Sequence, residues 1–188
     1  VNTQVATAAA LAGWLIVEKI RDGHATSLGA ASGAVAGLVA ITPACAFVAP
    51  WAAVVIGLIA GILCALAVGL KYKFNYDDSL DVVGVHLVGG LWGTLSIGIF
   101  ATTQATSWGA NGLLYGGGTT LLGKQALGAF SVMAFSFIVT GIIGWLLNKT
   151  IGFRICRDEE IEGVDITSHA ESAYELDSRA SGSFVGTH

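Results

Sequence analysis

An uncharged stretch, residues 82–101, constrains the fold of this chain more than any other feature. Its length matches the ~20 apolar residues that a helix needs to cross the hydrocarbon core of a bilayer. The carboxylates of Asp77, Asp78 and Asp81 stand just before it, where the positive end of a helix dipole favours negative charge. A titratable side chain, His86, lies inside the stretch. We therefore predict a membrane-spanning helix that contains an imidazole.

The histidine inside this predicted span has two interpretations. It can donate to a neighbouring carbonyl and serve packing alone, or it can belong to a site that takes up and releases protons. Ionisable residues inside spans generally mark functional pathways, and imidazole exchanges protons near neutral pH. Glycines on the same segment permit the close approach of other helices that a buried site requires: Gly84, Gly89, Gly90, Gly93 and Gly98. We favour the proton-exchanging site.

The composition also indicates a membrane protein. The chain is 54% hydrophobic and 12% charged, whereas soluble domains average about 25% charged residues. The acidic residues after residue 157 account for most of the formal charge of −4, and no basic cluster indicates nucleic acid as a partner. Cys45, Cys64 and Cys156 have no paired spacing, so we expect no disulfide, no metal and no cofactor.

Apolar segments predict an all-α, polytopic membrane domain over residues 1–149. The five expected spans are residues 2–20, 28–49, 51–70, 80–101 and 124–148. Pro43 and Pro50 separate the second span from the third, with a short turn expected near residues 44–50, because without a break the run is too long for one helix. Glycines repeat every four residues in both segments and predict close helix contacts: Gly29, Gly33 and Gly37, then Gly57 and Gly61.

The basic residues predict the orientation of these spans. If the five spans alternate in direction, all but one of the basic residues fall on the same side of the membrane. That side holds Lys19, Arg21, Lys71, Lys73, Lys149, Arg154, Arg157 and Arg179, and Lys124 lies on the other. The positive-inside rule then places the C-terminal tail in the cytoplasm of a multi-pass protein of the cell membrane. Residues 102–123 are expected to form an external loop, with a lid or vestibule wall as the alternative.

The tail, residues 150–188, is polar and acidic. It is either a solubilising end or a segment that docks beneath the membrane domain through apolar anchors, and we expect disorder after about residue 177. The anchors for docking are Ile155, Ile161, Val164, Ile166 and Tyr174.

Three ordered blocks cover nearly the whole chain. They are Asp77-Asp-x-x-Asp81-Val-Val-Gly-Val-His86 with Gly89-Gly90-x-Trp92-Gly93; Gly29-Ala-Ala-Ser-Gly33-Ala-Val-Ala-Gly37 with Thr42-Pro43-Ala44-Cys45; and Glu160-x-x-Gly163-x-Asp165 with His169 and Ala173-Tyr174. Together they resemble the ammonium transporter (Amt/Mep/Rh) family. The residues after His86, Leu-Val-Gly-Gly, favour its Amt branch over its Rh branch.

The resemblance implies an architecture larger than this chain. Members typically have eleven membrane helices in two pseudo-symmetric halves and form homotrimers with one pore per subunit. This chain resembles the last five helices and the tail. It begins Val-Asn-Thr without a Met, so we expect further helices upstream, which would carry the first pore histidine, the phenylalanine gate and the external aromatic residues.

The resemblance also assigns residues to the pore. His86 matches the second of two facing pore histidines, and Val82, one turn earlier, faces the pore. Asp81, Thr42 and Ser32 match structural residues near it. The implied function is ammonium transport, in which ammonium loses its proton, ammonia passes the histidines of a narrow apolar pore, and the proton is relayed separately.

The tail block implies regulation. Asp165, Thr167 and Tyr174 match regulatory positions, and a PII-type signalling protein can block the cytoplasmic exit in this family. Phosphorylation of Thr167 would add repulsion beside acids, although an ordinary solvent-facing threonine is an equal interpretation. This sequence departs from the family at Leu87 and Ala170, where glycine is usual.

Two other functions compete with transport. A sensor of the same fold would signal through its tail and conduct little. An intramembrane enzyme is a poor fit, because the spans hold one histidine with no nucleophile and no second acid, and we expect no enzymatic activity.

Overall fold

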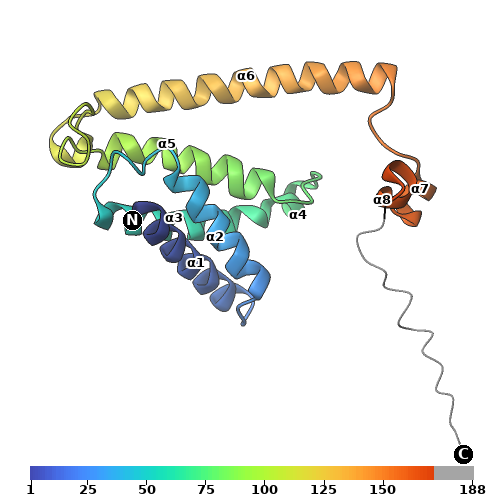
Figure 1. Cartoon of the computed structure of the whole chain (residues 1–188), viewed down its shortest axis with the longest axis horizontal. Coiled ribbons are helices and arrows are strands. Elements are labelled where there is room, and N and C mark those ends of the chain that lie inside the picture. Colours follow the sequence, from blue (N-terminus) through green and yellow to red (C-terminus); the bar gives the residue numbers. More distant parts are fainter. Residues whose placement is uncertain (172–188) are drawn as a thin grey trace, which may run out of the picture. The chain divides into compact units, whose positions relative to one another are not determined.

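The structure, a computed structural model, describes residues 1–171. Helices joined by turns and loops make up this part of the chain (Figure 1), which contains an isolated bridge between Val48 and Ala101 but no strand. The all-α class is thereby confirmed. The chain forms two units that divide after Ala134, and each is described by itself.

The first unit contains most of the helices. They are α1 (Asn2–Arg21), α2 (Ser27–Ile41), α3 (Pro50–Val68), α4 (Leu70–Phe74), the π-helix η1 (Val82–Leu87), α5 (Val88–Phe100), the short 3-10 helix η2 (Leu113–Tyr115) and the start of α6 (Thr120–Thr150). The second unit holds the rest of α6 together with α7 (Arg157–Glu162) and α8 (Val164–His169).

Within residues 1–171, three helical segments are long and apolar enough to cross a membrane: Pro50–Phe74, Val82–Phe100 and Thr120–Thr150. The last has 31 residues, which at 1.5 Å per residue is about 46 Å and exceeds a hydrocarbon core of about 30 Å. The segment Ser27–Ile41 is apolar but shorter.

Two segments differ from the helices expected from the sequence. The second was expected to reach residue 49, but α2 ends at Ile41 and turns follow as far as Phe47. Pro43 has no N–H to continue the helical ladder, which explains the early end. The fourth segment opens as a π-helix at Val82 rather than as an α-helix.

Backbones touch where the glycine repeats predicted close contacts. A Cβ built on Gly57 of α3 would lie 2.2 Å from the carbonyl oxygen of Ala6, and one on Gly61 would lie 2.1 Å from that of Ala10. These distances leave no room for a methyl group. The prediction of close packing at these glycines is confirmed. The residue numbers increase in the same direction on both helices, from the pair Gly57–Ala6 to the pair Gly61–Ala10, so α1 and α3 run parallel.

The same contacts give the directions of the other helices. Gly33 of α2 lies against Trp14, whereas Gly37, further along α2, lies against Ala6, so α2 runs antiparallel to α1. The fourth segment, η1 with α5, runs antiparallel to α3, because its Gly84 lies against Val68 and its later Gly89 lies against the earlier Cys64. Helix direction therefore alternates over α1, α2, α3 and α5.

The alternation gives the first unit two chemically different ends. At one end Arg21 Nη1 donates to the carbonyl of Ala65 at 2.9 Å, which joins the ends of α1 and α3. The basic residues of the last turn of α1 and of α4 belong to this end: Lys19, Arg21, Lys71 and Lys73. At the other end the N–H of Thr102 donates to the carbonyl of Phe47 at 2.9 Å, so the loop after α5 packs on the turns after α2.

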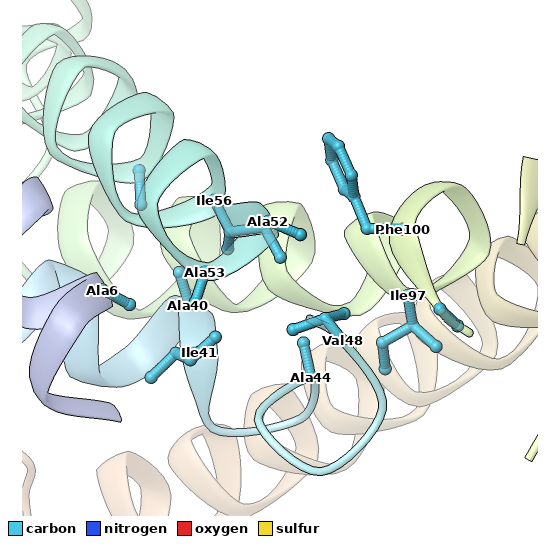
Figure 2. Close-up of a cluster of buried hydrophobic side chains, with 12 residues drawn as sticks. Ala6, Ala40, Ile41, Ala44, Val48, Ala52, Ala53, Ile56, Ile97 and Phe100 are labelled. Atoms are coloured by element: carbon cyan, nitrogen blue, oxygen red, sulfur yellow. The ribbon is translucent and has the colours of Figure 1, made fainter. Parts of the chain in front are cut away.

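A core of small side chains lies between the helices (Figure 2). Alanines dominate it, and Ile41, Ile56 and Phe100 fill the wider spaces. Trp92 of α5 lies at its edge and donates Nε1–H to the carbonyl of Ile56 at 3.0 Å. Small side chains let the helices approach closely, and this close approach holds the fourth segment against α3.

We expect Gly61→Ala to destabilise the intact protein by about 1–3 kcal/mol, the usual cost of overpacking. The added methyl would collide with the backbone oxygen of Ala10 rather than with a flexible side chain. Thermal unfolding in detergent, followed by tryptophan fluorescence, measures the effect. Gly128→Ala in α6 is the control, because nothing lies within 4 Å of its added Cβ; equal melting temperatures for the two variants would contradict the packing described.

Candidate functional site

The candidate site lies on η1, at the end of the first unit that carries the basic residues. A π-helix accommodates one more residue per turn than an α-helix and is often found at functional sites. The N–H of Val88 donates to the carbonyl of Val83, five residues earlier, which is the π pattern. His86 lies within this widened turn, and α5 continues for 13 residues beyond η1.

One face of η1 is buried and another is exposed. Gly84 and Val85 are buried against α3, where the thiol of Cys64 lies 3.7 Å from the carbonyl oxygen of Val85. The side chains of Val82 and His86 are exposed, Val82 by 52%. Since they are four residues apart, or about one turn, the two predicted pore residues share a side of the helix.

The carboxylate of Asp78 caps the start of η1. It accepts hydrogen bonds from the N–H groups of Val82 at 2.8 Å and Val83 at 2.9 Å. The first N–H groups of a helix have no partner inside it, and a carboxylate there also interacts favourably with the helix dipole. The cap determines the residue at which the helix begins.

Asp81 sits directly before η1 in a strained conformation. Its φ of 56° and ψ of 34° are left-handed, which is uncommon for a residue other than glycine. Its carboxylate pairs with Lys71 Nζ at 2.7 Å, and the same ammonium donates to the carbonyl of Asp78 at 3.1 Å. The side chains of Lys71 and Asp81 are only 15% and 28% exposed, so solvent screens the pair less than it screens a surface pair.

The other two predicted pore-side residues lie on α2, which packs beside α5 where Gly89 approaches Ala36. Thr42 is exposed at the end of α2, and its hydroxyl donates to the carbonyl of Leu38 at 2.6 Å. Ser32 is half-buried ten residues earlier, about 15 Å along the helix. The structure does not bring Thr42 and Ser32 together, and their roles stay predictions.

The second unit places two of the predicted tail residues on α8. Asp165 is exposed in the first turn. Thr167 is half-buried rather than exposed, and its hydroxyl donates to the carbonyl of Gly163 at 3.0 Å. Tyr174 lies outside the described residues, as does the segment after residue 177 for which disorder was expected.

A left-handed residue ends α8. Ala170 has φ 53° and ψ 34°, and its N–H donates to the carbonyl of Ile166 at 3.1 Å. The following N–H, of Glu171, donates to the carbonyl of Asp165 at 3.0 Å. A left-handed residue whose N–H donates to the carbonyl four residues earlier is the αL cap, and that residue is usually glycine. Ala170, where the family usually has glycine, therefore occupies a position whose backbone conformation favours glycine.

Sequence reasoning missed three structural roles. Asp78 and Lys71 were not recognised as anchors of the fourth segment, although an acid just before an apolar run is an N-cap signal. Glu18 stands at the charged end of the first expected span, yet it is only 9% exposed. It accepts from Trp14 Nε1 at 3.2 Å and from the N–H of Thr26 at 2.9 Å, and so joins α1 to the start of α2. No local pattern reveals that contact.

In the part of the chain that the structure describes, no three His, Cys, Asp or Glu side chains gather as metal ligands do.

Comparison with known proteins identifies the family. A family model described as Ammonium Transporter Family matches residues 1–174. The chain is 55% identical to an ammonium transporter of Mycobacterium tuberculosis over 98% of this chain, and 47% identical to one of Bacillus subtilis over 93%. The chain belongs to the ammonium transporter family. The resemblance inferred from the sequence is thereby confirmed.

Solved structures of this family have the same helical fold. Mep2 of Saccharomyces cerevisiae matches 84% of this chain with a TM-score of 0.76 at 35% identity, and a structure named Sensor Amt Protein matches 92% with 0.76 at 34%. The chain spans only about two fifths of its relatives: 40% of the M. tuberculosis protein, 43% of the B. subtilis protein and 36% of Mep2.

We expect Ala170→Gly to stabilise the end of α8 by about 1 kcal/mol, because an L side chain in the left-handed region costs roughly 1–2 kcal/mol. Amide hydrogen exchange at residues 170 and 171 should slow. Gly163→Ala is the opposing variant, since Gly163 has φ +114° and a side chain there is strained. Faster exchange in Ala170→Gly would show that this cap does not limit the helix.

Proposed function

We propose that this chain forms part of a pore that transports ammonium across the cell membrane, with His86 as one of the pore histidines. One observation carries the proposal. In a chain of the ammonium transporter family, His86 and Val82 lie on the exposed side of a segment whose other side is packed against α3. The facing histidine would come from helices outside this chain.

The chemistry follows from the cost of moving an ion into an apolar passage. Transferring an unpaired cation into a low-dielectric medium has an idealised cost in the tens of kcal/mol, whereas neutral ammonia loses only its hydrogen bonds. A narrow apolar pore therefore selects ammonium by making it release its proton. The imidazole of His86 then offers a hydrogen-bond partner to ammonia and a path for the proton. Potassium and sodium have no proton to release and are excluded.

The basic end of the first unit supports a cytoplasmic location for that end, and with it for the tail. We propose a homotrimer in the cell membrane, whose tail interacts with a PII-type signalling protein. Under this orientation Asp78, Asp81 and η1 lie near the cytoplasmic exit of the pore, and membrane lipid contacts the apolar outer surface.

The second candidate is a sensor that binds ammonium and conducts little. The structural match to the protein named Sensor Amt Protein supports this second candidate. Ammonium-evoked current in liposomes distinguishes the two, because a transporter gives a sustained current and a sensor does not.

We expect His86→Ala to reduce ammonium-evoked current of the intact protein in proteoliposomes at least tenfold and to weaken discrimination against potassium. The variant loses the proton-exchanging group while keeping the apolar surroundings. His24→Ala is the matched control, since His24 is exposed in the loop between α1 and α2. Full current and full selectivity in His86→Ala would refute this pore role.

We expect Thr167→Asp to lower transport severalfold. The substitution removes the hydroxyl that donates to Gly163 and adds a negative charge to α8, two residues after Asp165. Ser168→Asp adds the same charge at an exposed neighbouring position and serves as control. Equal currents from the two variants would remove Thr167 from the regulatory mechanism.

A further inference from the structure

Three charged side chains form a clasp around the loop that leads into η1. Lys71 comes from α4, and Asp78 and Asp81 come from the loop. The ammonium of Lys71 contacts both the carboxylate of Asp81 and the backbone carbonyl of Asp78. Asp78 in turn uses both carboxylate oxygens on the N–H groups of Val82 and Val83. We refer to Lys71, Asp78 and Asp81 as the clasp.

We propose that the clasp positions the imidazole of His86, so that its three members are positioning residues for transport. This inference rests on the proposed function. None of the three has a hydrogen bond to His86, and their bonds reach only one another and the first backbone N–H groups of η1. Their effect on the imidazole therefore passes through the helix backbone.

The widened turn makes that effect large. Asp78 holds the start of η1, before His86 in the chain. Between the two, Gly84 packs against Val68, where an added Cβ would lie 2.8 Å from a methyl carbon. One residue corresponds to about 100° of rotation in a helix with 3.6 residues per turn. If the start of η1 loosened and the π-turn relaxed to an α-turn, the side chain at position 86 would turn away from Val82.

The clasp also holds a left-handed turn. Asp81 adopts φ 56°, a conformation that is uncommon for residues other than glycine, although Asp adopts it more readily than most. The ion pair with Lys71 holds the carboxylate of Asp81 in this turn. The turn brings the carboxylate of Asp78 within hydrogen-bond distance of the first N–H groups of η1. Because Lys71 contacts both Asp81 and the carbonyl of Asp78, removal of its ammonium should loosen the turn that presents Asp78 to the helix start.

The primary test compares two lysines of α4. Lys71→Met removes the clasp's cation. Lys73→Met removes an equal charge two residues away, where Lys73 lies over the ring of Phe74 at 5.8 Å. We expect Lys71→Met to reduce ammonium-evoked current of the intact protein in proteoliposomes at least tenfold and to shift the pH dependence of the remaining current. Lys73→Met should retain the current and its pH profile. Equal effects from the two variants would overturn the proposal.

A second pair tests the backbone conformation. Asp81→Gly and Asp81→Ala both lose the carboxylate, but only glycine adopts the left-handed conformation without strain. We expect Asp81→Gly to retain severalfold more current than Asp81→Ala. Apparent melting temperatures check that both variants fold, and equal currents from two folded variants would contradict the role of this turn.

The environment of the histidine can also be measured without transport. Solid-state NMR of the intact protein labelled with ¹⁵N-histidine reports the imidazole resonances of His86, assigned with His86→Ala. We expect these resonances to shift in Lys71→Met and to stay in place in Lys73→Met. If the unmutated protein carried no current, the proposed transport function would fail while this spectrum still tested positioning. Unchanged His86 resonances in Lys71→Met would overturn the clasp's role.

Discussion

Contacts between helix backbones hold the first unit together. In a bilayer, lipid tails are as apolar as the side chains of leucine, so burial alone gives helices no reason to associate. Packing between closely apposed surfaces supplies the attraction, and it requires residues without bulk. Gly57 and Gly61 let α3 lie on the carbonyl oxygens of α1, and Gly93 lets α5 lie on that of Ala40. The positions of all other groups, including His86, depend on these contacts.

Polar groups within this frame are held by specific partners. Glu18 joins α1 to the start of α2, and Asp78 caps η1, both at the basic end of the unit. Among the described side chains, no buried nitrogen or oxygen lacks a hydrogen-bond partner. His86 stands apart from these groups because its side chain is exposed, on the side of η1 away from the packing with α3. A group that binds a solute in transit has to remain accessible in this way.

Much of the fold could be predicted from sequence because the membrane limits the options. Uncharged runs of adequate length indicate helices, prolines mark their limits, and the glycine repeats at Gly33 and Gly57 indicate where helices touch. The same reasoning located His86 as an ionisable group inside a span. It did not locate the end of α2 at Ile41 or the π-turn at Val82. Both depend on hydrogen bonds that a hydropathy pattern does not record.

By itself the sequence determined the class of the protein, its family and the residue around which a pore could be built, since hydrophobic length, charge asymmetry and motif order are properties of the chain. Only the tertiary structure decided that Lys71 reaches Asp81 and that Asp78 caps the helix start. The physical reason is that these relations depend on a left-handed turn and a widened helical turn. Their geometry is settled by contacts with α3 and α4, not by the local residues alone.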